Sequence, residues 1–173
     1  MDRSTTIQET DRLIIRRLSM ADAEFILRLV NEPSWLNFIG DKGVRTIADA
    51  QGYLVNGPLE MYDCLGFGLY AVESKEEGQA IGICGLIKRD FLEDADVGFA
   101  FFPEYWGQGY AYESAAAVMD HGKKVLGLKR ILAITTSDNH RSEKLLKKLG
   151  FRYERMTRHP GEEKEVRLFA IEF

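Results

Sequence analysis

The sequence predicts an α/β fold of the α+β kind, with a mixed central sheet flanked by helices. Segments whose apolar residues recur at helical spacing alternate with short runs of β-branched and aromatic residues, and their order is βααβββαβαββ. Strands and helices in such an order bury their apolar faces against one another as layers. Because 173 residues is a usual size for one folding unit, we expect residues 1–173 to form a single domain.

The first third of the chain is expected to contain one strand and two capped helices. Residues 12–18 form the strand. The sequences Ser-Met-Ala-Asp at 19–22 and Thr-Ile-Ala-Asp at 46–49 match the capping box, in which a hydroxyl and an acidic side chain bond the free N–H groups that begin a helix. Residues 31–40, between these helices, are expected to be irregular.

The remainder of the chain is expected to supply the other strands and helices. The strands are predicted at residues 66–73, 80–87, 95–102, 130–136, 153–158 and 166–172. An Ala-rich helix is predicted at 110–126, and a second helix is capped by Asp138 or Asn139 and ended by Gly150. The polar residues 74–78 are typical of a turn, so the two strands around them should form a hairpin.

Composition excludes several classes of protein. Lys and Arg number 23 against 27 Asp and Glu, and this net charge of −4 argues against duplex nucleic acid as the main partner. No apolar run approaches the ~18 residues that cross a membrane, so we expect a cytoplasmic protein with no membrane partner. Cys64 and Cys84 lie in apolar surroundings and the three histidines are scattered, so we expect two buried thiols and no metal site.

The stretch from 101 to 113 (Phe-Phe-Pro-Glu-Tyr-Trp-Gly-Gln-Gly-Tyr-Ala-Tyr-Glu) joins a predicted strand to a predicted helix. Glycines at 107 and 109 let a backbone approach a phosphate closely, and the N–H groups at a helix start attract anions. Taken alone, the two glycines fit a tight turn equally well. No Lys-Ser/Thr follows them, and a third glycine is missing, so neither a P-loop nor a dinucleotide fingerprint is present.

A second segment adds specificity to this loop. Residues 128–142 (Leu-Lys-Arg-Ile-Leu-Ala-Ile-Thr-Thr-Ser-Asp-Asn-His-Arg-Ser) predict a strand, a polar turn and a helix start, and the helix ends in Lys-Leu-Gly-Phe at 148–151. With Val-Gly-Phe-Ala-Phe-Phe before the glycine loop at 97–102, the chain resembles the GNAT acetyltransferase superfamily, most closely its RimJ/RimL-like branch. The resemblance runs from about residue 12 to the C-terminus and includes residues 38–50.

The resemblance implies a mostly antiparallel sheet in which two parallel strands, residues 95–102 and 130–136, splay apart and admit the pantetheine arm of acetyl-CoA. The implied cofactor-binding residues are Phe101, Phe102 and Pro103 along pantetheine, Gly107, Gln108, Gly109, Tyr110 and Ala111 around the pyrophosphate, and Asn139 and Ser142 on the other side of pantetheine. Trp106 departs from the family, which has a polar residue at the first position of this motif.

The implied reaction is direct attack of a primary amine on the thioester. Such an amine is mostly protonated at pH 7, so a base must accept a proton, directly or through water. Asp96 is the first candidate, because it opens the strand before the glycine loop, and Glu93, Asp94 and Glu104 are the alternatives. A backbone N–H near residues 99–101 is the donor that the family implies for the oxyanion.

The acid that protonates the leaving thiolate is less evident. Many family members have a tyrosine four residues after the position of Ser142, but this chain has Leu146 there. Ser142 is the remaining hydroxyl, and solvent is the alternative. For the acceptor, we expect Trp35 and Tyr53 to shape the pocket, with core packing as the alternative.

Charge is unevenly distributed along the chain. Residues 90–120 contain seven acidic and no basic residues, whereas residues 141–158 contain seven basic residues. An acidic region near the acceptor would favour a cationic amine, and a basic one would meet the 3′-phosphate of the cofactor; two solvated faces are the alternative. Arg45 either binds a substrate carboxylate or pairs with Asp41 or Asp49.

We therefore expect an acetyl-CoA-dependent N-acetyltransferase whose acceptor is a small-molecule amine or a protein N-terminus. Because Trp106 and Leu146 depart from the family pattern, a catalytically silent acyl-CoA-binding module is the alternative. A third reading is a generic α/β interaction domain. The apolar strand at 166–172 is suited either to the core or to a homodimer interface.

Overall fold

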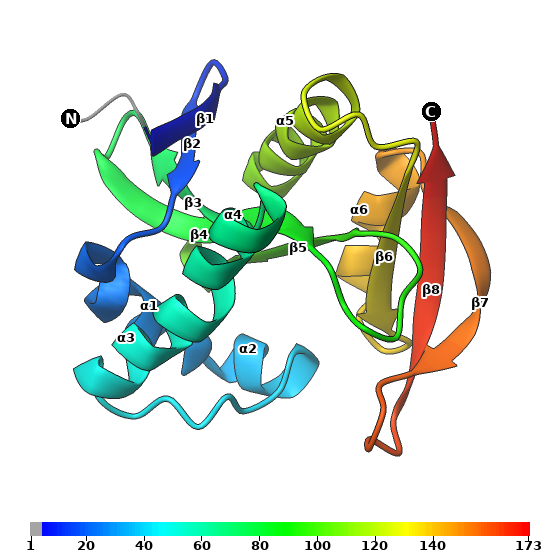
Figure 1. Ribbon diagram of the computed structural model, residues 1–173, viewed down its shortest axis with the longest axis horizontal. Helices are drawn as coiled ribbons and strands as arrows, with labels where there is room; N and C mark the ends of the chain where they lie inside the picture. Colours follow the sequence, from blue (N-terminus) through cyan, green and yellow to red (C-terminus); the bar gives the residue numbers. More distant parts are fainter. Residues whose placement is uncertain (1–4) are drawn as a thin grey trace.

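The computed structural model describes residues 5–173 and has an eight-stranded sheet with helices on both faces (Figure 1). The strand order is β1-β2-β3-β4-β5-β6-β8-β7. Neighbouring strands run antiparallel except β5 and β6, which are parallel. The predicted mixed, mostly antiparallel sheet flanked by helices is confirmed.

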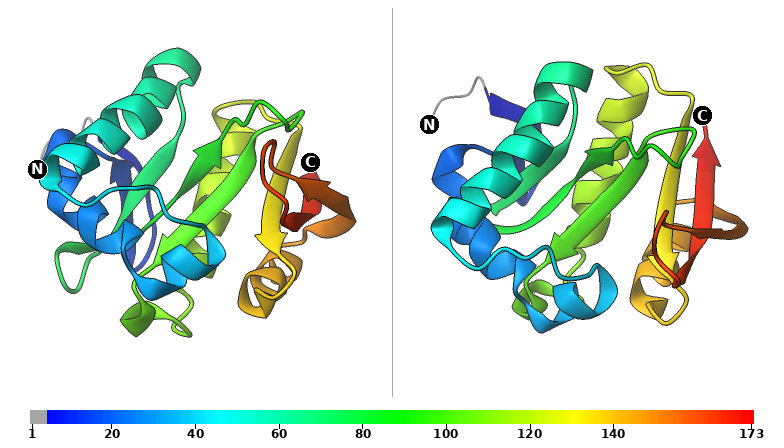
Figure 2. Two further views of the ribbon diagram at one scale, coloured as in Figure 1. Left: turned by 90° about the horizontal axis from the view of Figure 1, so that it is seen from below. Right: turned by 60° about the horizontal axis from the view of Figure 1, so that its bottom comes forward.

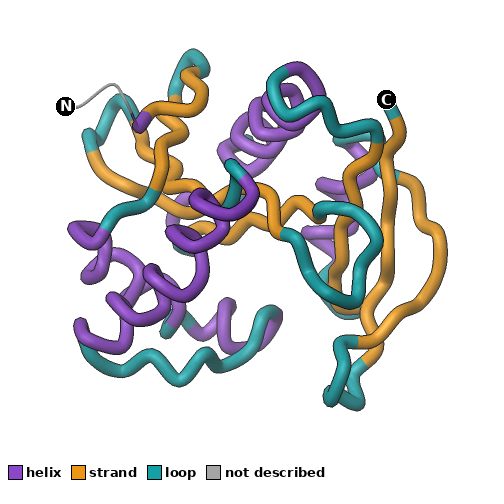
Figure 3. The backbone as a smooth tube through the Cα atoms, in the orientation of Figure 1, coloured by secondary structure: helices purple, strands orange, loops and turns teal. Residues whose placement is uncertain are grey.

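Figure 3 shows how strands and helices are distributed along the chain. The strands are β1 (Thr6–Glu9), β2 (Leu13–Arg17), β3 (Leu69–Ser74), β4 (Gln79–Ile87), β5 (Asp96–Phe101), β6 (Arg130–Thr136), β7 (Arg152–Arg158) and β8 (Glu165–Glu172). The α-helices are α1 (Ala23–Val30), α2 (Pro33–Phe38), α3 (Ile47–Leu54), α4 (Glu60–Leu65), α5 (Tyr110–Lys124) and α6 (His140–Lys148).

Both predicted capping boxes form. The Ser19 side chain accepts an N–H in the short 3-10 turn before α1, and the Asp22 carboxylate accepts the N–H of Ser19 at 2.8 Å. Thr46 and Asp49 exchange the equivalent bonds at the start of α3. Since these bonds satisfy N–H groups that have no partner within the helix, they fix where each helix begins.

Three segments differ from the prediction. Residues 31–40 are not irregular, because Pro33 begins α2, where its fixed φ suits a first helical turn and its missing N–H costs nothing. The helix that starts at α3 does not end at Leu54: it continues through the π-helical turn Val55–Leu59, which contains Pro58, into α4. The polar strand β1, which pairs antiparallel with β2, was also not predicted.

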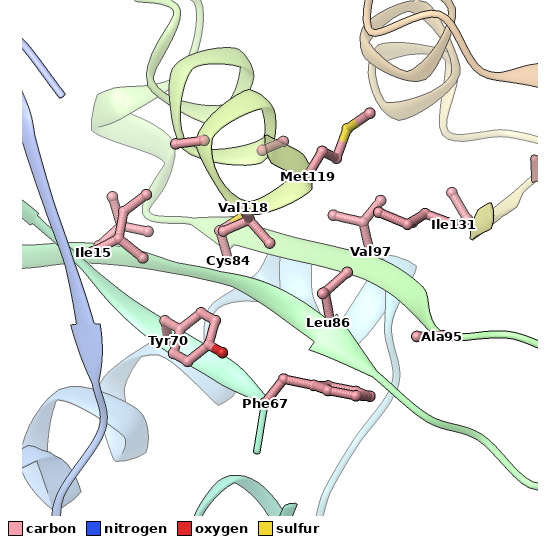
Figure 4. Close-up of a cluster of buried hydrophobic side chains, with 14 of the residues drawn as sticks. Ile15, Phe67, Tyr70, Cys84, Leu86, Ala95, Val97, Val118, Met119 and Ile131 are labelled. Carbon is pink, nitrogen blue, oxygen red and sulfur yellow. The ribbon is translucent and has the colours of Figure 1, made fainter. Parts of the chain in front are cut away.

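The core has two layers because successive strand residues point to opposite faces of the sheet. On one face α5 covers β4, β5 and β6, and Val118 and Met119 lie near Cys84, Val97 and Ile131 (Figure 4). On the other face α1, α2 and α3 cover apolar residues of β3 and β4. Helices therefore pack against both faces of this part of the sheet.

The prediction of two buried thiols is half wrong. Cys84 is buried in the core under α5, whereas Cys64 is exposed. Cys64 lies on α4, and its neighbour Tyr62 occupies the buried side of that helix. The apolar sequence neighbours of Cys64 did not predict its burial. Its exposure depends on which side of α4 the residue lies.

The pairing of β5 with β6 is confined to one residue pair, Asp96 and Leu132, where the N–H of Leu132 donates to the carbonyl of Ala95 at 2.9 Å. By contrast β4 pairs with every residue of β5, and β8 with every residue of β6. The two parallel strands therefore diverge from one end, as Figure 2 shows.

Replacement of Gly85 in β4 tests how closely the strands pack. A Cβ at this position would lie 2.1 Å from the carbonyl oxygen of Gly68 and 2.6 Å from Cα of Leu69, so backbone must move. We expect Gly85→Ala to lower the free energy of unfolding by about 1–3 kcal/mol, measured by urea denaturation. Gly52→Ala in α3, with no atom within 4 Å of the new Cβ, is the control and should not destabilise; equal stability of the two variants would contradict the packing.

Candidate active site

A cavity of about 1100 Å³ opens where β5 and β6 diverge. Residues 97–101 of β5 line one wall and residues 133–135 of β6 the other. The cavity extends on one side to the glycine loop and α6, and on the other to α2, α3 and the π-helical turn. Because β5 and β6 do not pair with each other along this opening, the N–H and carbonyl groups on their facing edges can bond a ligand.

The glycine loop forms one end of this cavity. Gly107 and Gly109 have φ of 74° and 85°, which residues with a Cβ rarely adopt, and α5 begins at Tyr110. Within residues 5–173 the N–H groups of residues 107–109 donate to no other protein group. With the free N–H groups of the first turn of α5, they form a surface suited to an anion.

An arginine from β1–β2 holds this loop in place. Nη1 of Arg12 donates to the carbonyl of Gln108 at 2.9 Å, and its guanidinium lies 4.4 Å from the centre of the Tyr110 ring. Arg12 also pairs with Glu113 at 2.6 Å, and Thr10 donates to the same carboxylate at 2.6 Å. These bonds join the turn before β2 to both the loop and the first turn of α5.

Three basic residues of α6 line the same end. Arg141, Lys144 and Lys148 all reach the cavity, and their spacing places them on one side of the helix. The Arg141 guanidinium lies 4.8 Å from the centre of the Trp106 ring, while Nε1 of Trp106 donates to the carbonyl of Phe101 at 2.9 Å. The Trp106 ring therefore packs against the Arg141 guanidinium, and its own N–H is used within the protein and not offered to the cavity.

The predicted cofactor residues separate into two groups. Those that line the cavity are Phe101, Gly107, Gly109, Tyr110, Ala111, Asn139 and Ser142; those that do not are Phe102, Pro103 and Gln108. Phe102 packs instead against Phe25 of α1, and the side chain of Gln108 donates to the carbonyl of Glu104. Asn139 caps α6 by accepting the N–H of Ser142 at 3.2 Å.

The other end of the cavity is mostly apolar. Trp35 and Tyr53 line it, together with Phe38, Leu69 and Ile83, and both also pack in the core cluster of α1 and α3. Trp35 is buried, and within the described residues its Nε1 has no hydrogen-bond partner. Burial raises the pKa of Tyr53, which keeps this phenol neutral.

Arg45 does not reach this end. Its Nη2 lies 2.5 Å from the Asp41 carboxylate, its backbone N–H donates to Asp49, and it is absent from the cavity wall. The structure therefore favours the ion-pair alternative over a contact with substrate, because Arg45 lies outside the helices that close the pocket.

Asp96 is the one of the four candidate carboxylates that lines the cavity. Its residue is 1% exposed, and Nε of Arg89 donates to its two oxygens at 3.0 and 3.2 Å. Burial raises the pKa of Asp96 to about 6, although the charge and hydrogen bond of Arg89 oppose the shift. Glu93 and Asp94 face Arg130 instead.

The acidic stretch at 90–120 does not form an acidic wall on the cavity. Glu113 pairs with Arg12, and Asp120 pairs with Lys124 on the outer side of α5. The acidic run therefore gives no support to a cationic acceptor, whereas the basic run does reach the glycine-loop end of the cavity through α6.

On α6, Leu146 is buried and lines the cavity, so no tyrosine hydroxyl is offered there, and Ser142 is the hydroxyl of this helix at the wall. Among residues 5–173 no three His, Cys, Asp or Glu side chains lie close enough to share a metal ion. None of the helices in the described part of the chain has the length and apolar character needed to cross a membrane.

Comparison with known proteins agrees with this geometry. The sequence model described as acetyltransferase (GNAT) domain matches residues 12–152. The uncharacterized N-acetyltransferase YoaA of Bacillus subtilis (strain 168) is 31% identical over 154 residues, which cover 88% of this chain and 86% of that protein.

Solved structures share the fold. An acetyltransferase (GNAT family) from Bacillus anthracis superposes with a TM-score of 0.78 at 24% identity, covering 95% of this chain and 96% of that one. RimL, a ribosomal L7/L12 alpha-N-protein acetyltransferase solved in complex with coenzyme A, has a TM-score of 0.82 at 16% identity, covering 96% and 97%. The resemblance read from the glycine loop and the strand–turn–helix segment is confirmed: the chain belongs to the GNAT acetyltransferase family.

Proposed function

We propose that the protein is an acetyl-CoA-dependent N-acetyltransferase that acetylates a primary amine. The observation that carries the proposal is the continuous cavity between β5 and β6, which connects free N–H groups at the glycine loop with an apolar chamber beside Asp96. A long cofactor with a phosphate group at one end and a reactive group at the other fits such a shape. Acetyl-CoA supplies the activated acetyl group.

The residues present fit this cofactor. The N–H groups of residues 107–111 are proposed to hold the pyrophosphate, and Arg141, Lys144 and Lys148 to balance its negative charge. The unpaired edges of β5 and β6 are proposed to hydrogen-bond the amides of pantetheine, with Asn139 and Ser142 on the side of α6. Trp106 donates a hydrogen bond to the carbonyl of Phe101, so this carbonyl already has a partner within the protein.

The proposed catalytic groups belong to residues that line this cavity. Asp96 is proposed to take the proton that the attacking amine loses, through a water molecule because the carboxylate is so little exposed. With a pKa of about 6, Asp96 is mostly ionised at neutral pH and is a stronger base than an ordinary carboxylate. A backbone N–H of residues 99–101 is proposed to stabilise the oxyanion, and the Ser142 hydroxyl to donate to the leaving sulfur.

The direct test measures binding and turnover separately. We expect acetyl-CoA to raise the melting temperature, since a ligand at 100 times its Kd stabilises a protein by about 2.7 kcal/mol. We expect amines from a panel of small molecules and N-terminal peptides to release free thiol from acetyl-CoA. Binding without turnover of any amine would mean a silent acyl-CoA-binding module, and absence of binding would contradict both.

Gly109→Ala tests the anion-binding loop. The new Cβ would occupy a backbone with φ of 85° and lie 3.2 Å from Nη2 of Arg12, so the loop must shift. We expect the KM for acetyl-CoA to rise about tenfold, as a strain of 1–3 kcal/mol allows, with less change in the KM for the amine. Gly161→Ala, with φ of 82° in the β7–β8 turn and no neighbouring atom, carries similar strain away from the cavity and should leave both constants unchanged.

Asp96→Asn tests the base. Protonation of Asp96 removes its basicity, so kcat/KM of the unchanged protein should fall as the pH drops through about 6. The variant should be about 100-fold slower at pH 7 and should keep only the decline caused by protonation of the amine substrate, without the further drop near pH 6. The Kd for acetyl-CoA, measured by calorimetry, should stay the same; an unchanged acidic limb would exclude Asp96 as the base.

A further inference from the structure

The arginine beside Asp96 uses only part of its hydrogen-bonding capacity. Arg89 lines the cavity and donates from Nε to both oxygens of Asp96. Its side chain is 27% exposed, and in the part of the chain that the structure describes its two terminal nitrogens donate to no protein group. A guanidinium with two free donors in one plane matches the two oxygens of a carboxylate.

A second cation lies at the same end. Lys42 lines the cavity, and its ammonium group has no ion pair or hydrogen bond with any of residues 5–173. Burial lowers the pKa of Lys42, the positive charge of Arg89 lowers it further, and Glu162 opposes the shift. Both cations line the same cavity, and an anion bound between them would reduce their mutual repulsion.

The acids and the histidine around this pair do not replace such an anion. Asp96 is engaged by Arg89, and Asp49 accepts the backbone N–H groups of Arg45 and Thr46. Glu162 lies in the β7–β8 turn and does not line the cavity. Glu32, which precedes α2, is also on the cavity wall, but among residues 5–173 it forms no ion pair with Arg89 or Lys42. Of the other nearby groups, Lys88 is a further cation near Asp96, and His159 has a pKa lowered by burial and by Arg89 and Lys42, with Glu162 opposing the shift.

The arrangement of opposite charges matches one chemical class of amine. In an α-amino acid the amine and the carboxylate are attached to the same carbon. Arg89 and Asp96 present a cation and an anion side by side at the wall of one cavity. A carboxylate on the free nitrogens of Arg89 would bring its own amine toward Asp96, and the buried Asp96 carboxylate would be reached through a water molecule.

The rest of this end is mostly apolar. Trp35, Phe38 and Ile83 line it, and a bulky apolar group buried among them contributes about 25 cal/mol for each Å² removed from water. A free polyamine would place its second ammonium group near Arg89 and Lys42, which is unfavourable. A protein N-terminus has a peptide bond where the carboxylate would be.

We propose that the acceptor is an α-amino acid with a large apolar side chain, whose carboxylate is bound by Arg89 and Lys42. This inference rests on the proposed N-acetyltransferase function and narrows its substrate. In the reaction the amine nitrogen forms a bond with the acetyl carbon while the bond from that carbon to sulfur breaks. The amine proton passes toward Asp96 and on to solvent, and the sulfur keeps the electron pair and takes up a proton.

The first experiment changes the acceptor and leaves the protein intact. Phenylalanine, phenylalanine amide and phenethylamine share one side chain, but the second has an uncharged carboxamide and the third lacks the group. We expect kcat/KM for phenylalanine to exceed that of either comparator by about tenfold or more, as for one lost charge-assisted hydrogen bond. The comparators' amines are respectively more acidic and more basic than that of phenylalanine, so amine protonation alone does not produce this order.

The second experiment changes the cation. Lys42→Met should raise the KM for phenylalanine about tenfold and leave that for phenethylamine unchanged. Lys124→Met, which removes an equal charge from the outer side of α5, is the control and should change neither.

Equal or faster acetylation of the amide and phenethylamine by the unchanged protein would overturn the inference and leave the proposed function intact. An equal rise in KM for all three acceptors in Lys42→Met would also overturn the inference and leave the proposed function intact. If the protein binds acetyl-CoA and acetylates no amine of any kind, the proposed function and the inference both fail.

Discussion

Between β5 and β6 the sheet has one residue pair, Asp96 with Leu132, and both the cavity and its chemistry depend on this interruption. Two parallel strands that separate leave backbone N–H and carbonyl groups without partners, which a protein tolerates only where water or a ligand satisfies them. The separation is held because each strand is paired along its whole length on its other side, with β4 or with β8. Helix α5 packs Val118 and Met119 across both strands, so the two parts of the sheet remain joined above the opening.

Local sequence predicted much of this fold because most of its determinants are local. Capping boxes, alternating strand residues and left-handed glycines act over a few residues, and the first two marked element starts to within three residues. Helix α2 was missed because it is short and begins with Pro33, which also occurs in loops. Strand β1 was missed because its residues are polar and only pairing with β2 reveals them.

The site was less accessible to such reasoning, since its key contacts join distant residues. Arg12 meets Glu113 across 101 positions, and nothing near the glycine loop indicates that an arginine from another strand fastens it. The basic run at 141–158 was informative because part of it lies on one side of one helix. The acidic run was misleading because it passes through a strand, a loop and a helix, and its side chains point in different directions.

The two ends of the cavity come from consecutive parts of the chain. Residues 29–100 supply the apolar end, and residues 105–148 supply the glycine-loop end together with one edge of the gap. Substitutions in the first part alter the shape and charge seen by an incoming molecule without touching the loop that Arg12 fastens. Evolution can therefore exchange one half of the site while keeping the other, and a designer who transplants α2 and α3 between relatives leaves the glycine-loop half intact.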